Sequence, residues 1–174
     1  MSGLIAPPAR AALTGLALLV AACAAPPAKV SAFRPAKAPI YSAAAFVSAR
    51  IEGRWHQAAT FSADGQPGCK AGSVAFQPVV GGGLAVSGGL CLNGQTVALS
   101  GPVQMAGPGR LSVPGMADWW VLWVDSGYRT LAIGTPDGRF GFVLDRGQIG
   151  ADRMAAAAEI FDFNGYAKAR LQPF

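Results

Sequence analysis

The chain has 174 residues, a formal net charge of +5 and a single histidine. Its 14 basic residues are scattered singly, so we expect no clustered basic surface of the kind that binds nucleic acid. One histidine without an acidic cluster argues against a metal site, and no cofactor is expected. High glycine, alanine and valine content with few charges favours a small β-barrel or sandwich over a helical bundle.

The chain begins with an uncharged apolar segment, residues 11–22, which follows Arg10. This layout is typical of a secretory signal and is too short to span a bilayer. Small residues lead directly into Cys23, and the pattern resembles a bacterial lipobox. The resemblance implies removal of residues 1–22, acylation of Cys23 and a membrane anchor. Ala24 resembles the sorting pattern for the outer membrane, on its periplasmic side. An ordinary signal peptide with an incidental cysteine is the alternative.

Residues 23–40 are rich in alanine and proline and predict an unfolded spacer. The folded domain is expected over residues 41–174. Within it, β-rich segments separated by glycine, proline and aspartate predict eight strands, at about 54–61, 69–78, 84–92, 95–104, 110–114, 118–125, 129–135 and 139–146. The apolar spacing over 151–163 predicts one helix, and Gly165 is placed to end it.

Cys69 and Cys91 are an even pair in an exported protein once Cys23 is acylated, which predicts a disulfide. We expect the two cysteines to face each other in an antiparallel hairpin whose loop is residues 77–83. On one face this register predicts the apolar pairs Val74–Val86 and Phe76–Leu84. Eight strands followed by one helix then predict an all-β fold, a closed antiparallel up-and-down barrel with the helix packed outside. Such a barrel can hold one small apolar ligand.

Three motifs resemble those of the lipocalin family. Gly53-Arg54-Trp55 is similar to the Gly-x-Trp signature that opens the fold, and Asp125-Ser126-Gly127-Tyr128 resembles the second motif. Arg146, at the end of the last expected strand, matches the lone arginine of the third. Residues 119–129 and the order of barrel, helix and tail especially resemble the bacterial outer-membrane lipocalins and apolipoprotein D. The resemblance covers about residues 41–174.

The resemblance implies that Arg146 packs across Trp55 and closes one end of the barrel, and that Asp125 and Tyr128 fix a turn. It also implies that the cup holds a hydrophobic ligand such as a fatty acid or a lysophospholipid. The chain departs from the family at His56-Gln57, where Tyr-Glu is usual. The short stretch from Trp55 to Arg146 implies short loops.

Candidate cavity residues come from two parts of the expected barrel. One wall is formed by the apolar hairpin residues Val74, Phe76, Leu84 and Val86. The other comes from 118–125, where alternation separates Trp120, Leu122 and Val124 from Trp119, Val121 and Trp123. Alternation leaves open which set faces inward, and the resemblance to apolipoprotein D favours Trp120 and Leu122. The other set is expected under the helix.

The sequence favours a binding protein over an enzyme. It contains no Gly-x-Ser-x-Gly elbow and no evident acid–base pair, and His56 is expected to be structural or exposed. A rival interpretation is a periplasmic protease-inhibitor barrel, which has similar strands, an early tryptophan and a similar cysteine bridge, and acts through a free N-terminal segment. The expected helix, the Asp-x-x-Tyr turn and the lipidated N-terminus argue against it. An enzyme on a lipocalin scaffold ranks last.

Overall fold

The computed structural model describes Gly3 and residues 32–174. The expected signal peptide, Cys23 and the first part of the spacer lie outside the described residues. The described elements, in chain order, are η1 (Ser48–Ile51), β1 (Gly53–Phe61), β2 (Ser73–Pro78), β3 (Leu84–Leu92), β4 (Gln95–Gly107), β5 (Arg110–Ser112), β6 (Trp119–Val124), β7 (Thr130–Gly134), β8 (Gly141–Asp145), α1 (Ala151–Phe163), η2 (Lys168–Arg170) and β9 (Leu171–Pro173).

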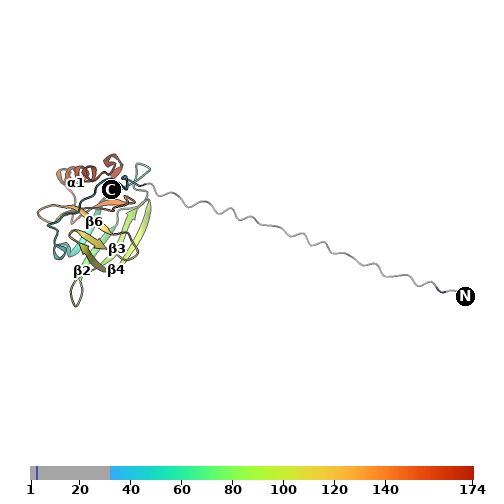
Figure 1. The fold of residues 1–174 in the computed structure, drawn as a ribbon, viewed down its shortest axis with the longest axis horizontal. Helices are drawn as coiled ribbons and strands as arrows, with labels where there is room; N and C mark the ends of the chain where they lie inside the picture. The colour runs from blue at the N-terminus through green and yellow to red at the C-terminus, as the bar shows by residue number, and fades with distance from the viewer. Residues whose placement is uncertain (1–2, 4–31) are drawn as a thin grey trace.

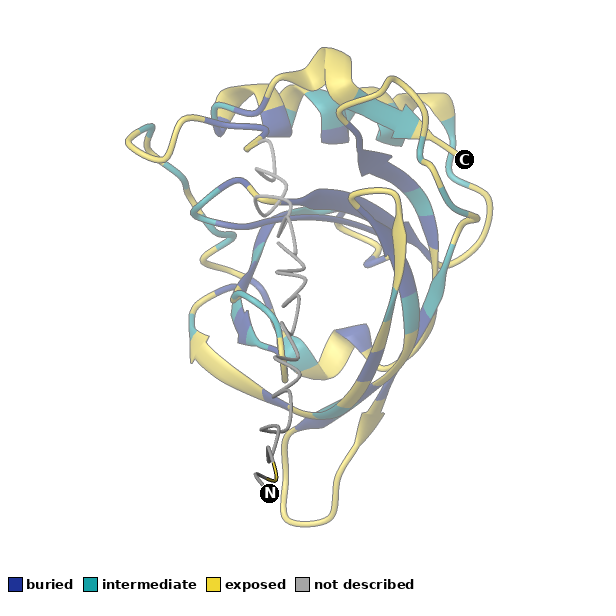
Figure 2. Cartoon of the chain, turned by 90° about the vertical axis from the view of Figure 1, so that its right-hand side faces the viewer, coloured by how far each residue is buried: buried dark blue, intermediate teal, exposed yellow. Residues whose placement is uncertain are grey.

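Strands β1 to β8 form a closed antiparallel barrel, as predicted (Figure 1). Each strand pairs with the next, and β1 closes the ring by pairing with both β2 and β8. Helix α1 lies across the outside, where Figure 2 shows it above the ring of strands. The short strand β9, which the sequence did not predict, pairs with the second half of β1. No helix among residues 32–174 is long and apolar enough to cross a bilayer.

Strands β2 and β3 form the predicted hairpin, and its apolar residues share one face as expected. The predicted register, however, is wrong by two residues. Phe76 pairs with Val86, and Val74 pairs with Gly88. The disulfide between Cys69 and Cys91 is present, but Cys69 precedes β2 instead of lying in it. The displacement occurs because the chain between Cys69 and Ser73 crosses very close to β3. A Cβ atom at Gly72 would lie 2.1 Å from the carbonyl oxygen of Gly89.

The expectation that Trp120 and Leu122 face the barrel interior is wrong. Both belong to the apolar cluster beneath α1, whereas Trp119 and Val121 belong to the interior cluster. Alternation also breaks at Leu122, where the pairing of β6 with β7 shifts register, so Trp123 joins the outer cluster too. Helix α1 covers the outer face of β6, so both faces of this strand are apolar. Hydrophobicity alone therefore could not show which face of β6 points into the barrel.

The folded unit begins earlier than the expected boundary at residue 41. Phe33 and Arg34 are buried, and the Phe33 amide donates to the carbonyl of Gly138. The Arg34 guanidinium donates to backbone carbonyls of Pro136, Asn164 and neighbouring residues of its own segment. These bonds satisfy a buried cation without a carboxylate, and they fasten residues 32–40 to the barrel.

Candidate functional site

One end of the barrel is closed by a tryptophan beneath an arginine. Trp55 is fully buried and donates its indole hydrogen to the carbonyl of Ile51 at 2.7 Å. The Arg146 guanidinium carbon lies 4.2 Å from the centre of the indole ring. The same guanidinium donates to the carbonyls of Tyr128, Arg50 and Glu52, each at 2.9 Å. Arg146 thereby joins β8 to η1 and covers the barrel end with a cation–π contact.

Gly53 is required by this closure. Its φ is +101°, a conformation that side chains other than glycine rarely adopt, and a Cβ there would lie 3.1 Å from the Arg146 guanidinium.

The turn between β6 and β7 is held by Asp125. Its carboxylate accepts from the amides of Arg129 at 2.6 Å and Thr130 at 2.7 Å, and from the Arg129 side chain at 3.1 Å. Burial acts to raise the pKa of Asp125, but the hydrogen bonds from Thr130 and Arg129 outweigh it and hold that pKa below its ordinary value. Asp125 is therefore a structural carboxylate that stays ionised.

Tyr128 links this turn to the closed end. It adopts a left-handed backbone with φ of +52°, and its hydroxyl accepts the Val47 amide at 2.9 Å. The Arg50 guanidinium carbon lies 3.8 Å from its ring centre, and Phe46 stacks against the ring. The two motif residues Asp125 and Tyr128 thus fix the closed end, and they line a shallow space of about 490 Å³ outside the barrel together with Arg50 and Trp123.

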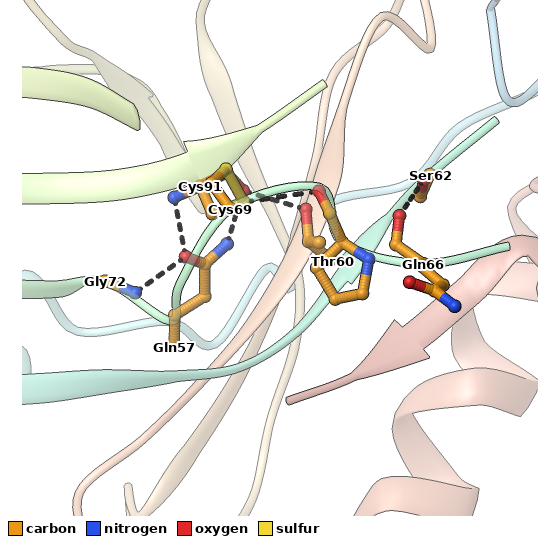
Figure 3. Close-up of a disulfide and its surroundings, with 8 residues drawn as sticks. Gln57, Thr60, Ser62, Gln66, Cys69, Gly72 and Cys91 are labelled. Atoms are coloured by element: carbon orange, nitrogen blue, oxygen red, sulfur yellow. Dashed lines mark hydrogen bonds between the residues drawn. A yellow bond between two sulfur atoms is a disulfide. The ribbon is translucent and has the colours of Figure 1, made fainter. Parts of the chain in front are cut away.

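A buried amide bridges β1 and β3 near the disulfide (Figure 3). The Gln57 side chain accepts a hydrogen bond from the Cys91 N–H at 2.8 Å and donates one to the Cys91 carbonyl at 2.8 Å. It therefore makes the two hydrogen bonds that a neighbouring strand would make. It also accepts from the Gly72 amide at 3.2 Å, and the Thr60 hydroxyl donates to the same Cys91 carbonyl at 3.0 Å. The departure from the family pattern at Gln57 is therefore part of a hydrogen-bonded network.

The other end of the barrel is open and carries a pocket of about 500 Å³. Strand directions place the β1–β2, β3–β4, β5–β6 and β7–β8 loops at this end, away from Trp55 and Arg146. All four connections, or the strand ends beside them, contribute to the pocket. Its apolar wall is formed by Phe33, Leu92, Val97, Met116 and Phe140. We call this space the mouth pocket.

An aromatic column leads from the mouth pocket into the barrel. Phe140 lines the pocket, and its ring stacks on Phe142 at 6.2 Å between centres. Phe142 meets the edge of the fully buried Trp119 at 5.0 Å. The Trp119 indole nitrogen has no hydrogen-bond partner among the described residues. An unpartnered buried donor costs about 1–3 kcal/mol, and an acceptor that reaches this N–H would remove that cost.

The predicted cavity residues fall into three places. The hairpin residues Val74, Phe76, Leu84 and Val86 are buried in the interior cluster, and none of them lines the mouth pocket. Leu84 lines a smaller space of about 340 Å³ near the closed end. Trp120 and Leu122 lie outside, under α1.

The mouth-pocket residues were missed by the sequence prediction. Phe140 could have been found, because it continues the inward alternation of Phe142 and Leu144 along β8. Met116 lies in a loop and gave no such signal. His56 is exposed on β1 and contacts neither the pocket nor the column.

Comparisons with known proteins give similar folds but no close relative. Neither protein-family models nor curated proteins match the sequence. Among solved structures, insecticyanin from the tobacco hornworm Manduca sexta is 14% identical with a TM-score of 0.57, covering 78% of this chain and 83% of that one. Per a 4, a major cockroach allergen, is 10% identical with a TM-score of 0.57, covering 78% and 92%. The siderocalin Ex-FABP is 14% identical with a TM-score of 0.55, covering 72% and 95%.

These structures are lipocalins, and their likeness to this chain rests on the barrel, since the shared identity is low. The closed eight-stranded barrel, the tryptophan under the arginine and the single outer helix agree with that likeness. The protein therefore has the lipocalin fold.

Proposed function

We propose that this protein is a membrane-anchored lipocalin that binds, stores or carries a small hydrophobic ligand in the bacterial envelope, with a fatty acid or a lysophospholipid as the ligand. The observation that carries the proposal is the mouth pocket, whose apolar wall includes Phe140 of the aromatic column and which is also lined by the polar residues Ser62, Asp64, Gln66, Asn93 and Gln95. Its volume of about 500 Å³ lies in the range usual for small-molecule sites.

Binding would be driven by burial of the ligand chain. Each methylene moved from water into apolar surroundings contributes about 0.8 kcal/mol. The Trp119 N–H adds a polar partner, since a carboxylate or ester oxygen that reaches it would satisfy a donor left unpaired within the described residues. An amphiphile with an acceptor at one end of a long chain fits both requirements.

Lipid attachment at Cys23 and an outer-membrane location are the remaining parts of the proposal. They are supported by the lipobox-like sequence that ends in Cys23. Mass spectrometry of the mature N-terminal peptide tests them directly, because a diacylglycerol thioether on Cys23 has a defined mass. A mature N-terminus at any other residue would contradict the anchor.

Ligand binding is favoured over protease inhibition by the start of the folded chain. An inhibitor of the rival class uses a free N-terminal segment, but here residues 32–40 are fastened to the barrel by Arg34. Helix α1 and the Asp125–Tyr128 turn also match the lipocalin arrangement.

The test is binding of a dansyl-labelled undecanoic acid to the purified protein, followed by fluorescence. We expect saturable binding, and we expect Trp119→Phe to weaken it about tenfold or more, as loss of a hydrogen bond to a charged group implies. Trp120→Phe is the matched control, because Trp120 lies on the outer face of the same strand. A probe with a methyl group in place of the carboxylate should bind both variants equally. Probe fluorescence no higher than with denatured protein would refute the proposal.

A further inference from the structure

The described chain enters the barrel at the mouth end. Phe33 is held between the β7–β8 loop and the segment after α1, because its amide donates to Gly138 and its carbonyl accepts from Ala167, both at 2.8 Å. Phe33 also lines the mouth pocket. The first described residue of this segment, Ala32, therefore lies beside the opening and far from the closed end.

The chain between Cys23 and Phe33 is short. Ten residues extend to about 35 Å at most, and a nine-residue strand such as β3 already spans about 30 Å. A lipid on Cys23 would therefore hold the mouth end within about 35 Å of the bilayer, and because this reach exceeds the strand length, the surface of each end decides which one faces the membrane.

Exposed aromatic side chains lie near the same end. Phe163 is 72% exposed and Tyr41 is 56% exposed, and their ring centres are 5.8 Å apart. The pair is fixed, because the Tyr41 amide donates to the Asn164 side chain at 2.7 Å, directly after α1. That end of α1 is at the mouth, since the Tyr166 hydroxyl contacts Thr135 and Phe140 beside the β7–β8 loop.

Basic side chains accompany the aromatic pair. Lys37 and Arg170 are exposed, and neither forms a salt bridge within residues 32–174. Arg170 is at the mouth, because its carbonyl accepts the amide of Ser62 at the end of β1. Aromatic rings beside basic groups suit the headgroup region of an anionic bilayer, where rings sit at the interface and cations pair with phosphates.

We propose that the mouth end of the barrel rests on the membrane surface, with Tyr41 and Phe163 at headgroup depth and Lys37 and Arg170 over anionic lipid. This inference rests on the proposed lipid anchor and ligand pocket. It adds a partner for that site: the pocket opens toward the bilayer, so an amphiphile can pass between the two without crossing bulk water.

The competing surface is the closed end. There Arg50 and Arg146 are exposed near an exposed Val47, and the β2–β3 loop carries Val79 and a fully exposed Val80. The rest of this loop is three glycines, residues 81–83, so the loop has no charged and no aromatic side chain. The two ends lie on opposite sides of the barrel, so a depth measurement distinguishes them.

The experiment uses the full mature lipoprotein in vesicles of phosphatidylethanolamine and phosphatidylglycerol. One nitroxide is placed at the mouth by Asp118→Cys, at a residue of the β5–β6 loop that does not itself line the mouth pocket, and another at the closed end by Val80→Cys. Both positions are exposed loop residues, and Cys69 and Cys91 are already oxidised. Electron paramagnetic resonance then compares collisions with oxygen, which concentrates in lipid, and with a nickel chelate, which stays in water.

We expect an oxygen-to-nickel ratio at least about twofold higher at residue 118 than at residue 80, as for groups within 5–10 Å of the acyl boundary. In the double variant Tyr41→Ser/Phe163→Ser, the ratio at 118 should fall toward that at 80. Equal aqueous ratios at both labels, or a higher ratio at 80, would overturn the proposed orientation. Probe binding measured on the same samples separates this result from the ligand proposal: binding that persists with an aqueous label at 118 overturns the orientation alone.

Discussion

Gln57 gives a sharp test of how this barrel is held together. Gln57 lies where β1 stops pairing with β2 and begins to pair with β9. There its side-chain amide takes the place of a strand partner: it accepts from the Cys91 N–H and donates to the Cys91 carbonyl. In Gln57→Met the side-chain volume is nearly kept, but the Cys91 amide is left buried without a partner. The Cys91 carbonyl still accepts from Thr60, and the half-buried Gly72 amide can reach water.

The expected loss follows from this count. One buried unsatisfied amide costs about 1–3 kcal/mol, and the lost bond to the Cys91 carbonyl contributes about 1 kcal/mol more. We therefore expect Gln57→Met to lower the free energy of unfolding by about 2–4 kcal/mol, measured by urea denaturation with an unchanged m-value. Gln77→Met on exposed β2 is the control, with little change expected. A difference between the two variants below about 0.5 kcal/mol would refute the network's role.

A carboxyl at the same position adds a test by pH. In Gln57→Glu the neutral acid can accept from Cys91 and donate to its carbonyl, as the amide does. Burial favours the neutral form and raises the pKa of the carboxyl above its unfolded value of about 4.3. The variant should therefore be near wild-type stability below that pH and lose stability as pH rises, in contrast to the flat response of the parent at this site.

Three further predictions concern the ends of the barrel and the disulfide. Replacing both Cys69 and Cys91 by alanine should reduce stability by about 3 kcal/mol, since the bridge spans 22 residues, and a change below about 1 kcal/mol in urea would contradict this. Asp125 has a lowered pKa, so its contribution is present above the unfolded carboxyl pKa and lost as pH falls through the folded one. Asp125→Asn should therefore flatten the acid limb of the stability profile, and an unchanged limb would contradict the assignment. Arg146→Met should lower the melting temperature and increase hydrogen exchange in η1, because the hydrogen bond from Arg146 to that segment is lost. Gly53→Ala should have the same two effects but more weakly, because it strains the backbone beneath Arg146 without removing the guanidinium.

Much of the fold could be predicted because local signals agreed with the tertiary arrangement. Strand β3 has the predicted bounds, since Asn93-Gly94 marks the turn that follows it. Helix α1 also begins and ends as predicted, with Gly165 in a left-handed conformation after it. The register of the hairpin was not predictable from the cysteines alone, because the close approach at Gly72 displaced Cys69 from the strand.

The site was harder to predict than the barrel. Which face of β6 points inward depends on α1, which covers the other face with apolar side chains, so hydrophobicity is equal on both. The mouth pocket depends on loops that converge only when the ring closes. Residues 32–40 have the composition of a spacer, and only the many carbonyls around Arg34 make their burial favourable.

The attachment of residues 32–40 also decides how the barrel bears mechanical load. A pull on the chain upstream of Ala32 passes into the Arg34 guanidinium and the Phe33 amide, and from there into the β7–β8 turn and the segment after α1. Strand β1 is reached only later along the chain, so tension is not applied to its paired edges first. Under the proposed lipid anchor, thermal motion at the membrane would therefore load the contacts of Phe33 and Arg34 before the strand pairing of β1.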